Sequence, residues 1–238
     1  MAGPSPLANL SLRAQLRVDR LPLRLAQMML GLTGFGLSLA MLLRSGLGGA
    51  PWDVLHTALA ERAGLSVGTV SITVSFLLLL AWIPLREQPG IGTIANSIWV
   101  GVSLDLGMTI LPPASTLPIA VLMMVAGVVI NGVSGAVYIG AQLGPGPRDG
   151  VMTGLGRRLR RPVGPVRIAL EASVLAAGWA LGGPVGVGTL AYAIGLGPVI
   201  QLVLPRVIMP VRTAGPASPS AAPETGEPVG PTPPAGPA

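Results

Sequence analysis

Long apolar stretches alternate with short polar ones along most of the chain. Six stretches approach the roughly 20 residues that a helix needs to cross about 30 Å of hydrocarbon, and each predicts a transmembrane helix. They are 25–43, 66–84, 91–111, 117–139, 165–182 and 188–207. Segment 52–63 (WDVLHTALAERA) is also helical in pattern. Its twelve residues would extend only about 18 Å at 1.5 Å per residue, so we expect a short helix that is interfacial or re-entrant.

The pattern occurs twice along the chain. A shift of 96 residues aligns 31–104 with 127–200 without a gap, and the residues are identical at 24 of 74 positions. The shared positions cluster in the string LGGAPWDV, which returns as LGPGPRDG, and in GIGTIANSI, which returns as GVGTLAYAI. Each copy holds three predicted spans. Because three is odd, the second copy must cross the membrane in the opposite direction to the first.

The predicted fold is therefore an all-α membrane protein. It has six transmembrane helices arranged as two inverted three-helix repeats, each with a short non-spanning helix after its first span. The expected divisions are a basic cytoplasmic N-terminal segment at 1–24, the first repeat at 25–116, the second repeat at 117–212 and a disordered Pro-rich tail at 213–238.

Composition and charge support this assignment and orient it. Half of the residues are hydrophobic and a tenth are charged, whereas soluble domains average about a quarter charged. The basic residues are all arginines, and most of them fall in the N-terminal segment, the linkers after the second and fourth spans and the C-terminal side. The positive-inside rule then predicts a multi-pass membrane protein with both termini in the cytoplasm, 44–65 outside and 140–163 inside. The net charge of +6 indicates membrane anchoring, and no nucleic-acid partner is expected.

The repeated string holds a glycine, a proline and an aspartate at equivalent places: Gly48, Pro51 and Asp53 in the first copy, and Gly144, Pro147 and Asp149 in the second. Glycine permits a tight reversal, proline is suited to a first helical position, and an aspartate in the first turn interacts favourably with the free N–H groups. One interpretation is a capped helix start. The other is a pair of half-length helices, one from each membrane face, whose ends approach a central solute or ion site.

The second repeated string contains Gly92 in the first copy and Gly188 in the second. Its GxGT pattern resembles a dinucleotide fingerprint, but it follows a membrane span rather than a β-strand, and the ribose-binding acid is missing. We interpret these glycines as allowing close packing at the start of the third span of each repeat.

Two acids fall inside predicted spans, where a charge is costly and usually faces a partner or a wet cavity. Glu171 lies one turn after Arg167, so an ion pair accounts for it. Asp105 has no basic residue one turn away, and Asn96 lies on the same helix; its counterpart in the second repeat is Gln201. Asp105 is the preferred functional carboxylate, with a hydrogen bond to the backbone of another helix as the alternative.

Catalytic signatures are missing. The chain has no HExxH or GxSxG motif and no cysteine, and its single histidine, His56, cannot form half of a metal site alone. We therefore expect no enzymatic activity, no cofactor and no bound metal.

The strings SGLGGAPWDVLHTALAERAGLSVGTV, GIGTIANSIWVGVSLDLGM and GPRDGVMTGLGRRLRRPVGPVRIALEASVLAAGWALGGPVGVGTLAYAIGLGP together resemble the YitT/YczE family of bacterial multi-pass membrane proteins. The resemblance covers about 25–205 and leaves out the Pro-rich tail. It implies an integral cytoplasmic-membrane protein and assigns no substrate.

Two functions follow from these patterns. Polar groups within the spans favour a transporter or permease-like protein for an unidentified small solute. The alternative is a membrane scaffold that regulates a partner protein without transport. The expected partners are the lipid bilayer and a small-molecule substrate, with a homo-oligomer as a further option.

Overall fold

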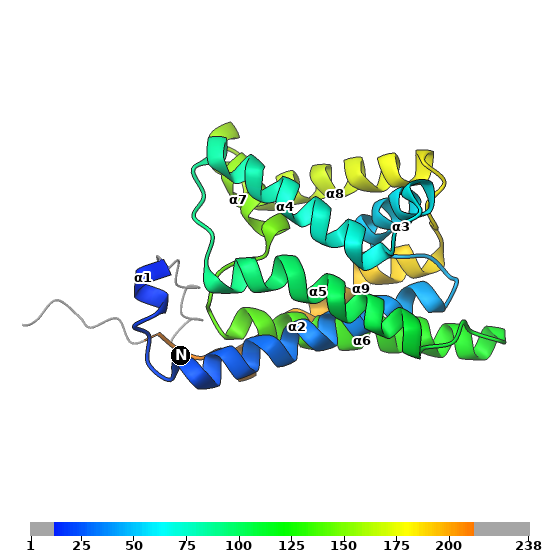
Figure 1. Cartoon of the computed structure of the whole chain (residues 1–238), viewed down its shortest axis with the longest axis horizontal. Coiled ribbons are helices and arrows are strands. Elements are labelled where there is room, and N and C mark those ends of the chain that lie inside the picture. The colour runs from blue at the N-terminus through cyan, green and yellow to red at the C-terminus, as the bar shows by residue number, and fades with distance from the viewer. Residues whose placement is uncertain (1–11, 212–238) are drawn as a thin grey trace, which may run out of the picture.

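The computed structural model describes residues 12–211, and the Pro-rich tail expected at 213–238 lies outside that range. The described part of the chain is all helical (Figure 1). Its elements are α1 (Leu12–Gln15), α2 (Leu21–Arg44), α3 (Pro51–Ala63), α4 (Val67–Leu85), α5 (Ile91–Ile110), α6 (Leu117–Gly140), α7 (Pro147–Leu159), α8 (Val163–Ala180) and α9 (Val187–Val207).

Six of these helices are long and apolar enough to cross a membrane: α2, α4, α5, α6, α8 and α9. They correspond to the six predicted spans. The number of spans and their positions, to within a few residues at each end, are therefore confirmed. The small differences arise from local caps. Ser66 accepts a hydrogen bond from the Thr69 amide at 3.1 Å and so begins α4. Arg86, with φ of 57°, ends it in the left-handed conformation.

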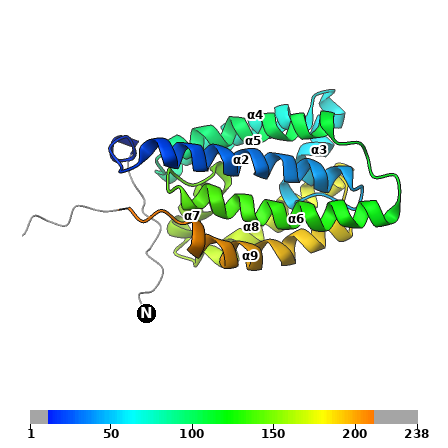
Figure 2. The same ribbon diagram turned by 90° about the horizontal axis from the view of Figure 1, so that it is seen from below.

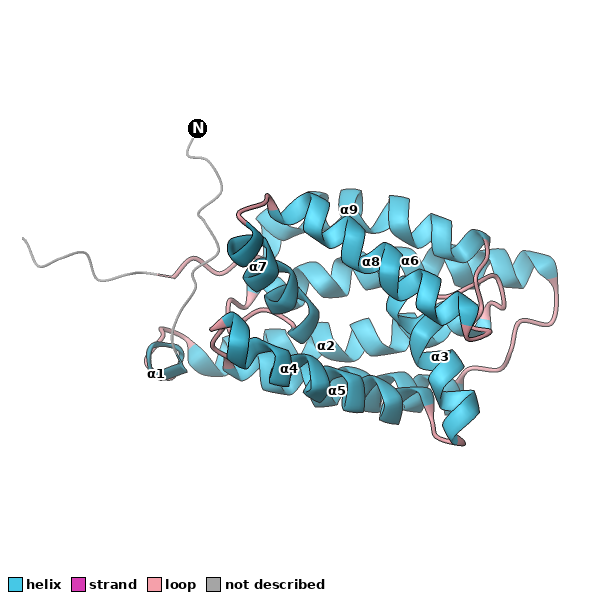
Figure 3. Ribbon diagram, turned by 90° about the horizontal axis from the view of Figure 1, so that it is seen from above, coloured by secondary structure: helices cyan, strands magenta, loops and turns pink. Residues whose placement is uncertain are grey.

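The two short helices, α3 and α7, each contain 13 residues, so they extend only about 20 Å. Both begin at a proline, Pro51 in α3 and Pro147 in α7, as the repeated string predicts. Figures 1 and 3 show α3 near one end of the bundle and α7 near the other. Neither helix is long enough to cross a membrane.

The central helices α2 and α6 lie side by side (Figure 2). Helix α5 packs on α2, and α9 packs on α6. Each short helix contacts a long helix of the other half of the chain, since α3 packs on α8 and α7 packs on α4. The two halves are therefore joined both along the central helices and through the short ones.

Size complementarity fixes the short helices. In α4, the Trp82 indole lies against Gly150 of α7, where a Cβ would come within 2.0 Å of the ring. The indole N–H also donates to the Pro147 carbonyl at 2.9 Å. On the other side of the bundle the sizes are reversed, because Gly178 of α8 lies against the backbone of Val54 and Leu55.

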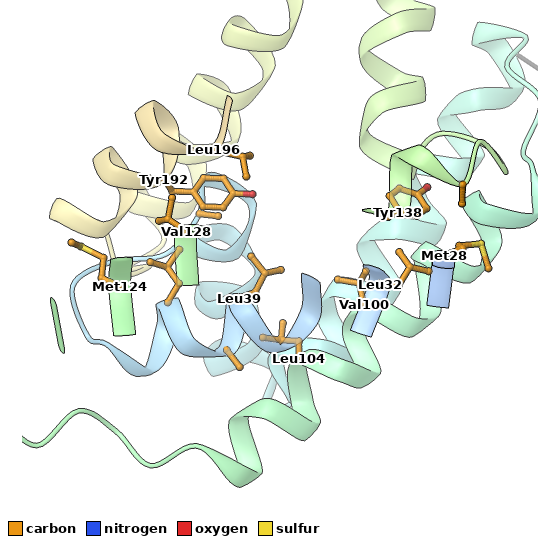
Figure 4. Packing of buried hydrophobic residues seen from close by; sticks show 14 of the residues in the cluster. Met28, Leu32, Leu39, Val100, Leu104, Met124, Val128, Tyr138, Tyr192 and Leu196 are labelled. Carbon is orange, nitrogen blue, oxygen red and sulfur yellow. The ribbon is translucent and has the colours of Figure 1, made fainter. Parts of the chain in front are cut away.

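Buried apolar side chains from α2, α5, α6 and α9 form the core, and Figure 4 shows them meeting between these helices. They include Leu32, Leu39, Leu104, Val128 and Leu196. The outer surface is also apolar. In the most apolar stretch of α8 only 11 % of residues are buried within the protein, and in α9 only 17 %. Such a surface is suited to a lipid environment rather than to water.

Candidate functional site

A cavity lies among the spans, next to the start of α3 and the start of α7. Its enclosed volume is about 120 Å³, or about 910 Å³ when the open mouth and all the space between the surrounding atoms are included. Its apolar walls include Phe35, Ile139 and Leu196. Its polar groups come from several helices: Ser71, Ser75, Asn96, Tyr138, Arg148, Asp149, Arg167, Glu171 and Tyr192.

Most of the lining residues form pairs in which one member lies 96 residues after the other, at the equivalent position of the second repeat. The pairs are Ala50 and Gly146, Pro51 and Pro147, Trp52 and Arg148, Ser71 and Arg167, Ser75 and Glu171, Asn96 and Tyr192, and Val100 and Leu196. The two members of a pair often differ in chemistry. The first half of the chain provides hydroxyl, amide and aromatic groups, whereas the charged lining groups come from the second half.

Two of these counterparts touch each other. Trp52 and Arg148 are the second residues of α3 and α7, and the guanidinium carbon of Arg148 lies 5.0 Å from the centroid of the Trp52 ring. This is a cation–π arrangement. Trp52 is only 5 % exposed, and its indole N–H has no hydrogen-bond partner among the described residues.

The two aspartates of the repeated string lie in the first turns of their helices, as predicted. Their surroundings differ. Asp149 is exposed and lines the cavity, and a Cβ on Gly146 would come within 3.1 Å of its Oδ2. Asp53 is fully buried, and its Oδ1 lies 3.5 Å from Nδ1 of His56. Neither Asp53 oxygen has a hydrogen-bond partner within residues 12–211.

The surrounding protein changes the pKa values of Asp149 and His56. Displacement of water by the surrounding protein raises the pKa of Asp149, and the guanidinium groups of Arg167 and Arg148 oppose the rise. Burial lowers the pKa of His56, and its contact with Asp53 opposes that fall. Both changes favour the neutral forms of the two side chains.

Arg167 and Glu171 form the predicted ion pair, with 2.9 Å between Nε and Oε1, and both line the cavity. Asn96 lines it as well. The structure therefore brings Asn96, Asp149 and Glu171 together at one site.

Asp105 lies outside the lining of this cavity. Its carboxylate accepts hydrogen bonds from the Ser66 hydroxyl at 2.6 Å and from the Gly68 amide at 2.8 Å, which caps the start of α4. This is the backbone hydrogen bond that the sequence left open as the alternative. Gln201, the counterpart of Asp105, is exposed on α9, so these two side chains do not join the other candidates.

The glycines of the two repeated strings determine the backbone conformation and the hydrogen bonds of the loops that precede α3 and α7. Gly48 has φ of 115° and Gly144 has φ of 116°, in a region that side chains rarely adopt. The residues before them accept matching hydrogen bonds: Leu143 from the Gly92 amide at 2.7 Å, and Leu47 from the Gly188 amide at 2.7 Å. Each loop thus docks on the start of the third span of the other half.

Sequence reasoning missed Trp52, Arg148 and Arg167 as members of one site. Arg148 directly precedes Asp149, yet as one arginine among many it was informative only for orientation. Among the described residues, no three His, Asp or Glu side chains lie close enough together to hold a metal ion.

Comparisons with known proteins agree with the membrane architecture. Residues 22–205 match the model of a family described as a family of unknown function, DUF6198. An uncharacterised protein of Haemophilus influenzae is 34 % identical over 177 residues, covering 74 % of this chain and 81 % of that protein. The uncharacterised membrane protein YczE of Bacillus subtilis is 37 % identical over 175 residues, covering 73 % and 81 %.

A more distant relative, the uncharacterised protein YyaS of Bacillus subtilis, is 24 % identical over 182 residues, which is 75 % of this chain and 90 % of that protein. No solved structure matches the chain. The matched region contains all six spans and both short helices, and the resemblance noted from the motifs is confirmed. The chain belongs to the DUF6198 family of YczE-like bacterial membrane proteins.

Proposed function

We propose that this protein carries a small solute across the cytoplasmic membrane and that the cavity between α3 and α7 is its solute site. The observation that carries the proposal is the set of charged side chains around a cavity inside a six-span bundle, with Arg148, Asp149, Arg167 and Glu171 among its walls. Ionisable groups within membrane helices are costly and usually mark a substrate or ion pathway.

The proposal includes two inverted repeats with both termini in the cytoplasm. Reciprocal contacts support it. The hydrogen bond from Gly92 to Leu143 becomes the one from Gly188 to Leu47 when the two halves are exchanged by 96 residues. The contact of Trp82 with Gly150 becomes the contact of Gly178 with Val54. Such exchange is expected of a pseudo-two-fold axis, and transporters of this architecture bind substrate at the interface between their repeats.

The two repeats differ in one contact, which suggests how the site could be opened. In the first repeat α4 packs on α5, and a Cβ on Gly68 would come within 2.1 Å of the Gly101 carbonyl oxygen. In the second repeat α8 and α9 are not packed in this way. The counterpart glycines, Gly164 and Gly197, have no atom within 4 Å of the Cβ position.

Exchange of these two packing arrangements would give alternating access. Helix α8 would close on α9 through Gly164 and Gly197, while α4 would leave α5. Asp105 then belongs to the closed contact of the first repeat, because its hydrogen bonds to Ser66 and Gly68 connect α5 to α4. The counterpart Gln201 offers a weaker, uncharged acceptor for the same role in α9.

The test is a comparison of small metabolites taken up by proteoliposomes that contain the protein and by empty liposomes, both incubated in the same cell extract. A transporter predicts at least one metabolite that accumulates only with the protein and whose uptake saturates. Identical contents in both preparations, with folded protein present, would favour the alternative role as a scaffold for a partner.

A further inference from the structure

The charged groups of the cavity differ in whether the protein already provides them with a partner. Glu171 pairs with Arg167 at 2.9 Å. Asp149 lies in the first turn of α7, where the free backbone N–H groups and the helix dipole favour a carboxylate. Arg148 is half-buried, and its guanidinium carbon lies 5.0 Å from the centroid of the Trp52 ring. Among the described residues, no carboxylate oxygen lies within 4.0 Å of its guanidinium group. The site therefore has an unsatisfied cation.

Other donors point to the same place. The starts of α3 and α7 both border the cavity. At a helix start the first N–H groups have no intrahelical acceptor, and the helix dipole adds partial positive charge. Two helix starts and one guanidinium group thus border the same cavity.

The nearby acids limit how much negative charge a ligand can carry. Asp149 borders the cavity, and the buried Asp53 follows Trp52 in the first turn of α3. A dianion would meet both, whereas a single negative charge is balanced by Arg148. A monovalent anion fits this balance better than a phosphate dianion.

We propose that the cavity binds its solute through a carboxylate group, which lies between the starts of α3 and α7 against the guanidinium group of Arg148. A carboxylate accepts two parallel hydrogen bonds from a guanidinium group. The proposal rests on the cavity being the solute site, and it names the chemical class of solute: small organic acids and other molecules with a free carboxylate.

The experiment measures ligand protection of the full-length protein in lipid nanodiscs, by its thermal unfolding midpoint. The probes are the sodium salts of acetate and propionate, inorganic phosphate, and tetramethylammonium chloride, all at one ionic strength. The carboxylates should raise the midpoint in a saturable way. Phosphate should protect less than either carboxylate, and tetramethylammonium should give no saturable protection.

Four variants separate the site from general salt effects. Arg148→Gln should raise the half-saturating carboxylate concentration by about tenfold or more, because a charge-assisted bidentate contact is lost. Arg148→Lys should raise the half-saturating carboxylate concentration less than Arg148→Gln does, because it keeps the positive charge. Trp52→Phe, which keeps an aromatic ring beside the guanidinium group of Arg148, should weaken binding less than Arg148→Gln does. Arg158→Gln is the matched control, since it removes the same charge from the exposed far end of α7 and should leave binding unchanged.

Equal protection of the wild type and of Arg148→Gln would overturn the proposal, and so would absence of protection by both carboxylates or protection by tetramethylammonium alone. The outcome is separable from that for transport. Carboxylate binding without uptake would support the carboxylate site and contradict the proposed transport function. Uptake of a cationic solute that is unaffected by Arg148→Gln would support the transport function and contradict the carboxylate site.

Discussion

Trp52 and Arg148 occupy the same position in the two short helices, and the guanidinium carbon of Arg148 lies 5.0 Å from the centre of the Trp52 ring. Residues that are 96 apart in sequence can meet in this way when the helices that carry them start close together. The contact therefore connects the sequence repeat to the cavity, because the two helix starts that it joins also form part of the cavity wall.

The orientation of the helices can be tested with reporter fusions. A topology reporter fused at Gly64, after α3, should report the external side, and one fused at Arg161, after α7, should report the cytoplasm. The arginines of the second linker are the physical reason, since positively charged loops remain on the cytoplasmic side. The same side for both reporters would contradict the inverted arrangement.

Asp105 should contribute to stability through the start of α4. Replacement by Leu removes the acceptor for Ser66 and Gly68, so we expect a loss of about 1–3 kcal/mol in the free energy of unfolding. Asp105→Asn keeps one acceptor and should lose less. Gln201→Leu is the control, because its side chain is exposed on α9 and its removal should have little effect. Unfolding of each purified variant by heat gives the comparison, and an Asp105→Leu protein as stable as the wild type would remove this role.

Gly48 should not tolerate a side chain. Its φ of 115° is unfavourable for other residues, and a Cβ would come within 2.6 Å of the Gly186 amide nitrogen. Gly46 also has positive φ, 69°, but nothing lies within 4 Å of its Cβ position. Gly46→Ala should therefore cost about 1 kcal/mol from the backbone alone, whereas Gly48→Ala should lower membrane abundance and the unfolding midpoint much further. Equal effects of the two substitutions would show that the close contact does not matter.

Helices α8 and α9 should approach each other during transport. The chain has no cysteine, so a double variant with Gly164→Cys and Gly197→Cys contains a single pair of thiols, one on α8 and one on α9. A disulfide needs Cα atoms about 4.4–6.8 Å apart, and we expect it to form under mild oxidation only in the state where α8 closes on α9. The single-cysteine variants are the controls. Thiols that are reactive to a small maleimide but never cross-link would argue against this movement.

The sequence predicted the helices well because hydropathy and length are local properties. The six spans, the two short helices and the prolines that begin them can all be identified without knowing which helices touch. The tight turns at Gly48 and Gly144 were predictable for the same reason, since glycine at such a place indicates an unusual backbone conformation.

The candidate site was harder to predict because its members come together only through packing between the halves. Asp105 has its partners 37 and 39 residues earlier in the chain, so nothing within one helical turn indicated them. Arg148 contacts a tryptophan 96 residues away. The ion pair of Arg167 with Glu171, in contrast, spans a single turn and was predicted from spacing alone.

Uptake by proteoliposomes tests the central claim most directly. Vesicles with wild-type protein, with Arg148→Gln and with Arg158→Gln are incubated in the same metabolite mixture, and their contents are compared by mass spectrometry. The account predicts that at least one small carboxylate accumulates with the wild type and with Arg158→Gln, and fails to accumulate with Arg148→Gln at equal protein content. Identical contents in all three preparations and in empty vesicles would contradict it.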